Sequence, residues 1–541
     1  MTTTPSATPP DTRPPRDWEL VYVSDPSNVC NYDFDPGDAR PLITSHPARP
    51  AELRRFIDHV ATSAADVFVQ EVYNAGWTMY FRSERFEYDA RPQHRRFLPM
   101  MDDGIMPLEV MLERCRERRM RCLAGFRVND NHGAPDQGAM FLHRNPQWKI
   151  TDVPPGGAFL PGNRMDFTVP EVRDYLYGVV AEVAARFDVD GVLLTMRDGL
   201  YFPAPGGDRN PARERQPLMT GLIERLRALL DGHGAARGRR LELGVLVPET
   251  LEDCHAVGLD VPAWIGSGLV DFVAPMDSSF TDFNAACEEF RALTAGTPCR
   301  LYPGVQPYCC SRESFGPPAT AENYRALAHA LRRQGADGMS VYNFQKHWGG
   351  FRSGKRGAET GWPAAFRLLR EARDPKRVAD GVRHYTYRSM WGGYHGISPS
   401  GTNVCGTMKD QKLILPREPG TPSASYRFRL FEEVEKTASA TLFLRAVGLG
   451  SADRIAVRLN GTEVPAGQLR RVYHREGRPA QAGRPLPPHT TCVIDLTPEL
   501  VVRGDNDLTL TLLFSGMVDV GALPDPEPIV VDEVDVTIVP A

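Results

Sequence analysis

The sequence predicts an α/β fold, a (β/α)8 TIM barrel followed by a C-terminal all-β sandwich domain. Short apolar runs alternate eight times with amphipathic helical patterns over residues 18–377, and this alternation is typical of a parallel barrel. Residues 378–541 instead carry about six short alternating strands and no long helix, which indicates a sandwich. A doubly wound open sheet is the alternative, but no glycine-rich phosphate loop follows the first strand.

The ends of the barrel region are set by changes in composition. Residues 1–17 are rich in Pro and Thr and have no apolar core, so they predict a disordered tail and not a secretory signal. The ten cysteines include no C-x-x-C pair, as expected for reduced, buried thiols. Together these features predict a cytoplasmic protein.

The barrel elements follow one another in a regular order. Each predicted strand is a short apolar run, and several end in polar or charged residues. The strands are expected at 18–25, 66–73, 122–126, 188–198, 241–249, 270–277, 300–308 and 336–344. The helices are expected at 50–61, 107–119, 166–187, 219–230, 251–258, 284–293, 321–333 and 362–372.

The C-terminal region has the two-residue periodicity of strands. The pair Asn460-Gly461 is a hairpin turn signal between two of these runs. The strands are expected at 426–431, 440–446, 454–459, 491–496, 507–514 and 533–539. Such a module could bind sugar, or it could buttress the barrel or a dimer interface, and we favour the structural role.

The polar stretch after the third strand is the strongest functional signal. Arg127, Asn129, Asp130 and His132 follow the apolar run 122–126 within a few residues. In a parallel barrel such a cluster at the carboxyl end of a strand lies where substrate binds. A guanidinium, an amide, a carboxylate and an imidazole can bind an anion and move a proton. The alternative is a loop in which Asn and Asp cap turns and the histidine is incidental.

Polar residues also stand at the ends of the other predicted strands. Because parallel strand ends converge in a barrel, these residues are expected to line one pocket together with the Arg127–His132 stretch. They are Asp25, Gln70, Tyr73, Arg197, Asp198, Glu249, Asp277, Gln306, Tyr308, Tyr342 and Asn343. Two arginines among amides and tyrosines suit a polar, hydroxylated and anionic ligand, since a guanidinium binds a carboxylate with two parallel bonds. An Asp and a His at separate strand ends suit general acid–base chemistry.

Composition excludes several other functions. The net charge is −5 and no basic block is present, so neither nucleic acid nor a membrane surface is an expected partner. No apolar run reaches the roughly 18–20 residues that a spanning helix needs. The thirteen histidines and ten cysteines lack metal-ligand spacing, so we expect no metal and no cofactor.

Several motifs resemble barrel glycoside hydrolases over roughly residues 18–375. They are Asp166-x-x-x-Pro-Glu-Val-Arg-Asp-Tyr, Asp188-x-Asp-Gly, FRVND-x-H at 126–132 and VDFVAPM at 270–276. In many of those enzymes the fourth strand ends in a catalytic aspartate. Thr195 stands near that point here, and it cannot replace a carboxylate, which argues against retaining chemistry with two close carboxylates.

This departure makes the chain similar to the inverting exo-sialidases of glycoside hydrolase family 156. That resemblance implies Asp25 and His132 as the catalytic pair, with Asp25 as acid and His132 as base or the reverse. It further implies that Arg127 and Arg197 hold the carboxylate of sialic acid and that Asn343 contacts the sugar. Gln70, Tyr73, Asn129 and Tyr342 complete the expected substrate site.

Two alternatives stay open at this point. One is a barrel glycosidase for another sugar that uses Asp130, Asp198 or Asp277. The other is a non-catalytic carbohydrate-binding barrel. Each of these functions implies a carbohydrate ligand, and a homodimer is possible.

Overall fold

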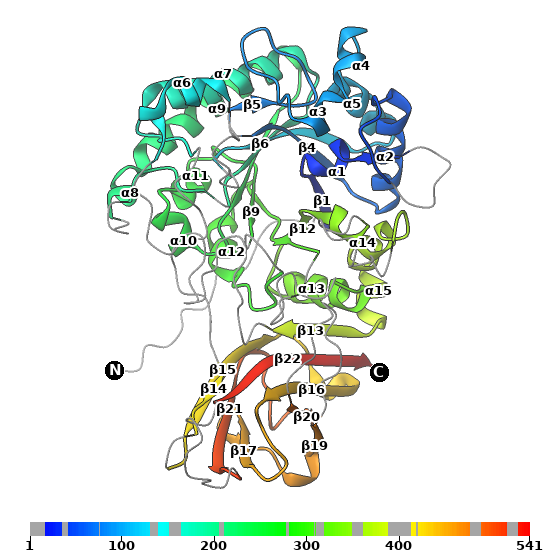
Figure 1. Cartoon of the computed structure of the whole chain (residues 1–541), viewed down its shortest axis with the longest axis vertical. Coiled ribbons are helices and arrows are strands. Elements are labelled where there is room, and N and C mark those ends of the chain that lie inside the picture. Colours follow the sequence, from blue (N-terminus) through cyan, green and yellow to red (C-terminus); the bar gives the residue numbers. More distant parts are fainter. Residues whose placement is uncertain are drawn as a thin grey trace.

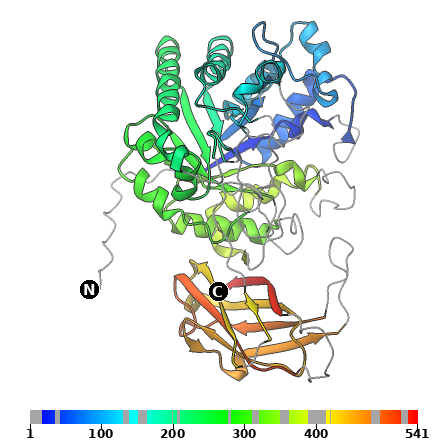
Figure 2. The ribbon, with the colours of Figure 1, turned by 60° about the vertical axis from the view of Figure 1, so that its left-hand side comes forward.

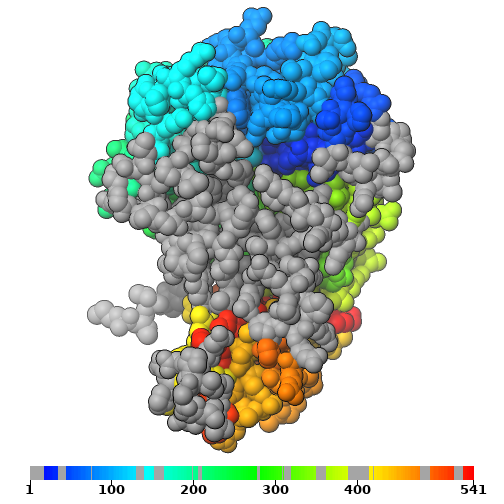
Figure 3. Space-filling view, in the orientation of Figure 1, coloured from blue at the N-terminus to red at the C-terminus, as the bar shows by residue number. Residues whose placement is uncertain are grey.

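The computed structural model divides the chain into an α/β part and a C-terminal part made of strands (Figures 1 and 2). Figure 3 shows in space-filling form that the light-blue and cyan segments of the α/β part and the orange segments of the C-terminal part occupy opposite ends of the longest axis. The structure describes residues 17–34, 42–74, 76–129, 139–150, 164–197, 199–204, 210–276, 281–307, 309, 319–348, 361–387, 413–417, 420–475, 488–516 and 528–541.

A curled, parallel sheet forms the centre of the α/β part. Its strands run in the order β10-β9-β8-β7-β6-β4-β1-β12-β11, and all of these neighbours are parallel. All eight strand positions expected from the sequence lie in this sheet. The strands are β1 (Glu19–Ser24), β4 (Val67–Asn74), β6 (Arg121–Arg127), β7 (Gly191–Thr195), β8 (Glu242–Val247), β9 (Phe272–Pro275), β10 (Arg300–Leu301), β11 (Gly304–Val305) and β12 (Gly338–Val341).

The two ends of this strand order belong to one short segment of chain. The backbone N–H of Tyr302, just after β10, donates to the carbonyl of Val273 in β9 at 2.9 Å. The carbonyl of Pro303, just before β11, accepts from Ser340 in β12 at 3.0 Å. Segment 300–305 therefore bonds to a strand on each of its two sides.

The two faces of the curled sheet pack differently. One face packs against helices, whereas the side chains of the other, inner face pack against one another in a separate core. Close packing there needs glycine, since a Cβ on Gly244 would lie 2.0 Å from the ring of Phe272. The inner core comprises Val21, Val23, Val67, Val69, Leu123, Leu193, Leu246, Phe272, Ala274, Met276, Tyr302 and Tyr342.

Helices follow most of the strands and cover the outer face (Figure 1). Several begin with proline in the first turn, where its missing N–H would have no helical partner. None of the helices in the described ranges is both long and apolar enough to cross a bilayer. They include α2 (Pro50–Thr62), α5 (Pro107–Glu117), α7 (Pro170–Arg186), α9 (Gln216–Arg237), α10 (Leu251–Ala256), α11 (Val261–Gly266), α12 (Glu288–Thr294), α13 (Ala321–Arg333) and α14 (Phe366–Arg373).

Four aspartates repeat one contact at the edge where the strands begin, which we call the amino edge. Asp66, Asp190, Asp271 and Asp337 each precede a strand. Each accepts a backbone N–H from a neighbouring strand, those of Leu20, Cys122 and Leu243 at 2.8 Å and that of Leu301 at 3.0 Å. Each of these aspartates thus links two adjacent strands just before their regular backbone hydrogen bonding begins.

A group of charged side chains also lies at the amino edge, and we call it the amino-edge cluster. Arg121 bridges the carboxylates of Glu19 and Glu242, and Arg300 lies 2.5 Å from Glu19. The hydroxyl of Tyr302 donates to Glu19. Interactions at this edge, away from the strand ends, generally serve stability in parallel barrels.

The C-terminal part consists of two antiparallel sheets. The predicted Asn460-Gly461 turn is confirmed, with φ of 51° and 82°, and it joins β17 to β18. One sheet runs β13-β22-β16-β20-β19 with β14 on β22, and the other runs β15-β21-β17-β18. The strands are β13 (Arg383–Tyr387), β14 (Ile414–Leu415), β15 (Ser423–Leu430), β16 (Thr437–Val447), β17 (Arg454–Leu459), β18 (Thr462–Glu463), β19 (Leu469–His474), β20 (His489–Asp495), β21 (Gly504–Phe514) and β22 (Ile529–Pro540).

These sheets pack against the helices that follow β9 and precede β12. Arg429 of β15 forms an ion pair with Glu288 of α12 at 2.7 Å. Arg325 of α13 donates from Nε to the carbonyl of Val382 at 2.8 Å. Glu432 accepts from both Arg383 and Tyr385 inside this contact. The interface therefore joins the two parts through an ion pair and a hydrogen bond to the backbone.

Candidate functional site

Six side chains meet at the edge where the strands end, and we call them the strand-end cluster. Asp25 follows β1, Glu71 lies in the last half of β4, and Arg127 ends β6. The parallel arrangement brings these positions together, because parallel strands end at the same edge of a sheet. The cluster comprises Asp25, Glu71, Arg127, Thr195, Arg197 and Tyr342, and all six are buried.

Asp25 is held by donors on both of its carboxylate oxygens. Nη1 of Arg127 donates to Oδ2 at 2.9 Å, and the hydroxyl of Tyr342 lies 3.3 Å from the same oxygen. The backbone N–H of Ser27 donates to Oδ1 at 2.8 Å, and the hydroxyl of Ser27 donates to it as well. Hydrogen bonds from N–H groups favour the ionised form of a carboxylate.

The backbone around Asp25 is fixed by the long insertion that follows β4. The hydroxyl of Tyr80 donates to the carbonyl of Pro26 at 2.6 Å. Arg96 donates to the carbonyl of Tyr32 at 2.5 Å and pairs with Glu52 at 2.6 Å. This insertion therefore packs over the turn and the short helix α1 (Ser27–Cys30) that place Asp25.

Glu71 is the second carboxylate of the cluster, and its side chain is fully buried. The hydroxyl of Thr195 donates to Oε1 at 2.7 Å, and the hydroxyl of Tyr342 lies 3.1 Å from Oε2. Nε of Arg127 lies 3.8 Å from Oε2. A Cβ on Gly125 would come within 2.9 Å of Cγ of Glu71, so the glycine in β6 leaves the room that this side chain occupies.

Tyr342 links the two carboxylates. Burial raises the pKa of its phenol well above the ordinary value, with Arg127 and Arg197 opposing and Glu71 and Asp25 reinforcing that effect. The phenol therefore stays protonated and can donate a hydrogen bond. The guanidinium of Arg197 lies over its ring at 4.4 Å from the centroid, a cation–π contact that orients both groups.

Three of the predicted substrate-binding residues make contacts within the protein framework. Gln70 donates to the carbonyls of Ser24 at 3.4 Å and of Glu71 at 3.1 Å. Asn129 accepts from the N–H of Met165 at 2.8 Å and donates to its carbonyl at 2.9 Å. Tyr73 contacts the sulfur of Met165 at 3.9 Å. Oε1 of Gln70, however, is buried without a hydrogen-bond partner among the described residues, so the predicted substrate contacts of these residues stay predictions.

Glu249, after β8, and Gln306, after β11, are buried. The remaining predicted residues divide into two groups. Arg127, Arg197, Tyr342 and Asp25 are brought together in the strand-end cluster, and Asn343 follows Tyr342 with a left-handed backbone, φ 56°. Asp130, His132, Asp198, Asp277 and Tyr308 lie outside the described residues, so their predicted roles stay predictions.

Glu71 and Thr195 are the two members of the strand-end cluster that were not predicted as site residues, and Glu71 is the one that carries a charge. Gln70 and Tyr73 were expected in the pocket because they are polar and end the second strand. The alternation Val67, Val69, Glu71 was the available signal, since successive side chains of a strand point to opposite faces. Val67 and Val69 lie in the inner core, and Glu71 continues that face before the register shift between Glu71 and Tyr73.

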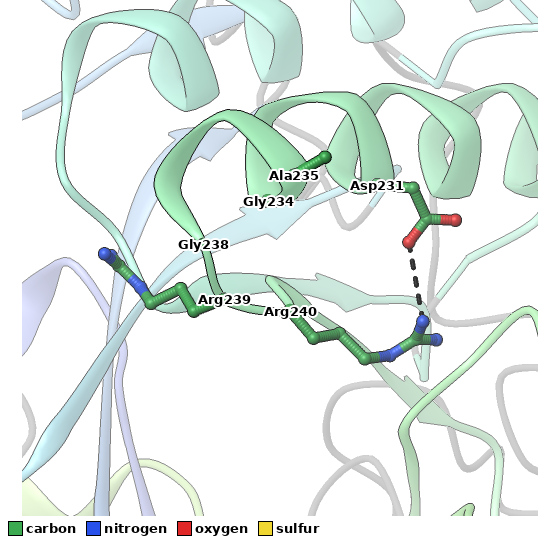
Figure 4. Close-up of a pocket in the computed structure, with 6 residues that line it drawn as sticks. All are labelled: Asp231, Gly234, Ala235, Gly238, Arg239 and Arg240. Carbon is green, nitrogen blue, oxygen red and sulfur yellow. Dashed lines mark hydrogen bonds and ion pairs between the residues drawn. The ribbon is translucent and has the colours of Figure 1, made fainter.

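Other features of the described residues do not add to this site. No group of three or more His, Cys, Asp or Glu side chains in the described ranges is arranged to hold a metal ion. A surface depression of about 340 Å³ lies at the end of α9, lined in part by Gly234, Gly238 and Arg239 (Figure 4). This depression lies at the amino edge, because Arg239 and Arg240 precede β8. Two of its lining residues, Arg240 and Asp231, form an ion pair at 3.4 Å.

The comparisons with known proteins point to glycosidases. A family model described as "Glycosyl hydrolase-like 10" matches residues 29–217. The chain is 24% identical over 251 residues to "Glycosyl hydrolase DigH" of Escherichia coli (strain K12), which covers 38% of this chain and 54% of that protein. The chain thus spans about half the length of this curated relative.

Two solved structures share only a distant likeness. The α-L-fucosidase isoenzyme 2 from Paenibacillus thiaminolyticus aligns with a TM-score of 0.42 and 12% identity over 66% of this chain and 49% of that one. The GH36 α-galactosidase AgaA from Geobacillus stearothermophilus aligns with a TM-score of 0.36 and 12% identity over 89% of this chain and 56% of that one. The family model and the curated relative together support a glycosidase.

Proposed function

We propose that this protein is a glycoside hydrolase that cleaves its substrate at the strand-end cluster, with Asp25 as a catalytic carboxylate. The observation that carries this proposal is the buried Asp25 carboxylate, fixed by Arg127 at 2.9 Å and by Tyr342 at 3.3 Å. A preorganised carboxylate among guanidinium and phenol donors can bind a sugar and transfer a proton. Similarity to "Glycosyl hydrolase-like 10" over residues 29–217 supports the reaction class.

The proposal includes a finer description of the fold. We propose that the curled sheet is a closed (β/α)8 barrel over residues 18–377 and that the two antiparallel sheets form a sandwich over residues 378–541. Support for closure comes from segment 300–305, which bonds to β9 on one side and to β12 on the other. We assign the sandwich a structural role, because its contacts with α12 and α13 include charge pairs and backbone hydrogen bonds.

We propose an inverting mechanism in which His132, after β6, is the second catalytic group. Inverting enzymes need one group to protonate the leaving oxygen and another to activate water on the opposite face of the sugar. Asp25 at the end of β1 and a histidine just beyond Arg127 suit these two tasks. Asp130, Asp198 and Asp277 are the alternatives for the second group in a glycosidase of another specificity.

An exo-sialidase is the second candidate function, and the two arginines of the cluster favour it. Arg127 is paired with Asp25, which is the arrangement of an arginine that neutralises a carboxylate. Arg197 stacks on Tyr342 and is the better candidate for binding a substrate carboxylate. Sialic acid carries its carboxylate at the anomeric carbon, so such an arginine would lie beside the bond that is cleaved.

A panel of aryl glycosides tests the main proposal. The panel includes sugars with and without a carboxylate, and each is assayed with the natural sequence and with Asp25→Asn. We expect one class of glycoside to be cleaved and the variant to lose that cleavage. A protein that binds one of the sugars but cleaves none of them would instead be a non-catalytic carbohydrate-binding barrel.

The sialidase candidate has its own test in Arg197→Lys. Lysine keeps the charge but loses the planar pair of donors. A charge-assisted bond contributes roughly 1.5–3 kcal/mol, so free sialic acid should bind about one to two powers of ten more weakly. Arg239→Lys, at the amino edge, is the matched control and should bind normally. Equal binding by the parent and Arg197→Lys would rule out carboxylate recognition by this arginine.

A further inference from the structure

One hydroxyl stands between the two carboxyl groups of the strand-end cluster. The phenol oxygen of Tyr342 lies 3.1 Å from Oε2 of Glu71 and 3.3 Å from Oδ2 of Asp25. A phenol carries one hydrogen, so it can donate to only one of these oxygens at a time. The other contact becomes a hydrogen bond only when the facing carboxyl carries a proton and donates to the phenol oxygen.

Two described neighbours of Asp25 favour its ionised form. Nη1 of Arg127 and the backbone N–H of Ser27 contact its two oxygens at 2.9 Å and 2.8 Å. Both groups are donors without an acceptor function. A proton on either oxygen of Asp25 would face an N–H group, so the charged carboxylate suits this environment better.

The two described hydrogen-bond contacts of Glu71 suit either its ionised or its protonated form. Thr195 at 2.7 Å and Tyr342 at 3.1 Å contact it through hydroxyl oxygens, and a hydroxyl can donate or accept. The guanidinium of Arg127 is farther away, with Nε at 3.8 Å. Glu71 is fully buried. Its neighbour Tyr342 also contacts Asp25, so the negative charge of Asp25 lies close by. Burial and a nearby negative charge both favour the neutral acid of Glu71.

We propose that Asp25, Tyr342 and Glu71 form a proton relay that holds one proton on Glu71 while Asp25 is ionised. This inference rests on the proposed function for the use of that proton. When the leaving oxygen of the substrate takes up a proton, that proton comes from Glu71. The Glu71 O–H bond breaks as its proton moves to the oxygen of Tyr342, the proton of Tyr342 moves to Oδ2 of Asp25, and Asp25 passes it to the leaving oxygen. The net result is transfer of one proton from Glu71 to the leaving oxygen, with Asp25 ionised before and after the step.

Two described guanidinium groups lie beside the relay, and their placement is consistent with it. Arg127 of β6 lies on the Asp25 side at 2.9 Å, whereas Arg197 after β7 lies over the ring of Tyr342. The positive charge nearest to a carboxylate oxygen therefore stabilises Asp25. Gly125 leaves space for Glu71, so the relay depends on the absence of a side chain at that position.

Infrared difference spectroscopy tests the relay without any substrate. A buried protonated carboxyl has a C=O stretching band that an ionised carboxylate lacks. We expect the spectrum of the natural protein minus that of Glu71→Gln, both at pH 7, to show this band. If the difference shows only the bands of an ionised carboxylate, the proton is not on Glu71 and the proposal is overturned.

Tyr342→Phe tests the role of the phenol, with Tyr302→Phe as the matched control. Both tyrosines belong to the inner core, and the hydroxyl of Tyr302 donates to the single carboxylate of Glu19. We expect Tyr342→Phe to shift the carboxyl band, to reduce kcat by about 10²–10⁴-fold and to change the pH dependence of kcat/KM. Tyr302→Phe should keep the band, kcat and the pH profile. An unshifted band in folded Tyr342→Phe would contradict the relay.

The two measurements separate failure of the relay from failure of the proposed function. A carboxyl band that disappears in Glu71→Gln, in a protein that cleaves no glycoside of the panel, would support the shared proton and refute the hydrolase proposal. Cleavage by the natural protein without such a band would support hydrolysis and overturn the relay.

Discussion

The two ends of the inner face carry nearly the same set of side chains but use them differently. Each end has two carboxylates, two arginines and one tyrosine, with Glu19, Glu242, Arg121, Arg300 and Tyr302 at the amino edge and Asp25, Glu71, Arg127, Arg197 and Tyr342 at the strand ends. Composition alone therefore does not distinguish a structural cluster from a candidate catalytic one.

Burial and connectivity distinguish the two clusters. The side chains of Glu19 and Arg121 are 17% and 32% exposed, whereas those of Glu71 and Arg127 are 0% and 6% exposed. At the amino edge Arg121 bridges the carboxylates of Glu19 and Glu242, and Tyr302 donates to Glu19. At the strand ends Tyr342 stands between two carboxyl groups. We infer that the position of the shared proton, and not the number of charges, distinguishes the candidate catalytic end from the structural one.

Asp25→Asn should cause the largest loss of activity, and it should separate the strand-end cluster most clearly from the amino-edge cluster. Loss of a general acid or base typically lowers the rate by about 10²–10⁴-fold. Glu242→Gln at the amino edge is the control and should leave kcat within a factor of about two of the natural value, because general acid–base effects need contact with the substrate. Near-normal turnover of Asp25→Asn with an unchanged melting temperature would remove Asp25 from the mechanism.

Gly125→Ala should have the next largest effect, because the added Cβ would meet Glu71 at 2.9 Å and Val69 at 3.1 Å. Overpacking of this kind costs about 1–3 kcal/mol, and misplacement of a catalytic group by about 1 Å can lower the rate roughly 100-fold. Gly221→Ala in α9, where nothing lies within 4 Å of the added Cβ, should keep the activity. Equal activity of both variants would show that the position of Glu71 is unimportant.

The strand positions could be predicted from sequence because apolar runs report burial directly. All eight predicted strand positions lie in the curled sheet, and the Asn460-Gly461 turn has the predicted backbone. Both signals are local. The first depends on which residues are buried, and the second depends on which residues tolerate a positive φ. Neither requires knowledge of distant parts of the chain.

The site could be predicted only in part because it depends on which face each side chain takes. Asp25, Arg127, Arg197 and Tyr342 were expected and lie together, whereas Gln70 bonds to backbone carbonyls. The register shift after Glu71 cannot be seen in the sequence. The room for Glu71 depends on Gly125 in the next strand, which is a contact between residues far apart in the chain.

Glu19→Gln should affect stability and not activity, and its effect should depend on pH. Burial opposes the charge of Glu19, but Tyr302, Arg121 and Arg300 outweigh it and lower the pKa. A lowered pKa contributes stability above the ordinary value near 4.5, and this contribution is lost as the pH falls through the pKa of the folded state. The unfolding free energy at pH 7 should fall by roughly 1.5–3 kcal/mol. Urea titrations at pH 7 and pH 3 check this, and an equal difference at both pH values would contradict the assignment.

Exhaustive removal of metal ions with a chelator should not change the rate of glycoside cleavage. A catalytic metal ion needs carboxylate lone pairs that face it, but the described contacts of Asp25 and Glu71 are with Arg127, Ser27, Thr195 and Tyr342. A divalent cation at Oδ2 of Asp25 would have to displace the guanidinium that lies 2.9 Å away. The measurement is kcat/KM before and after dialysis against a chelator, with the melting temperature as a control for unfolding. If the rate fell and zinc, calcium or magnesium restored it, the donors around Asp25 would have to rearrange to admit a metal, and the strand-end cluster would need a different mechanism.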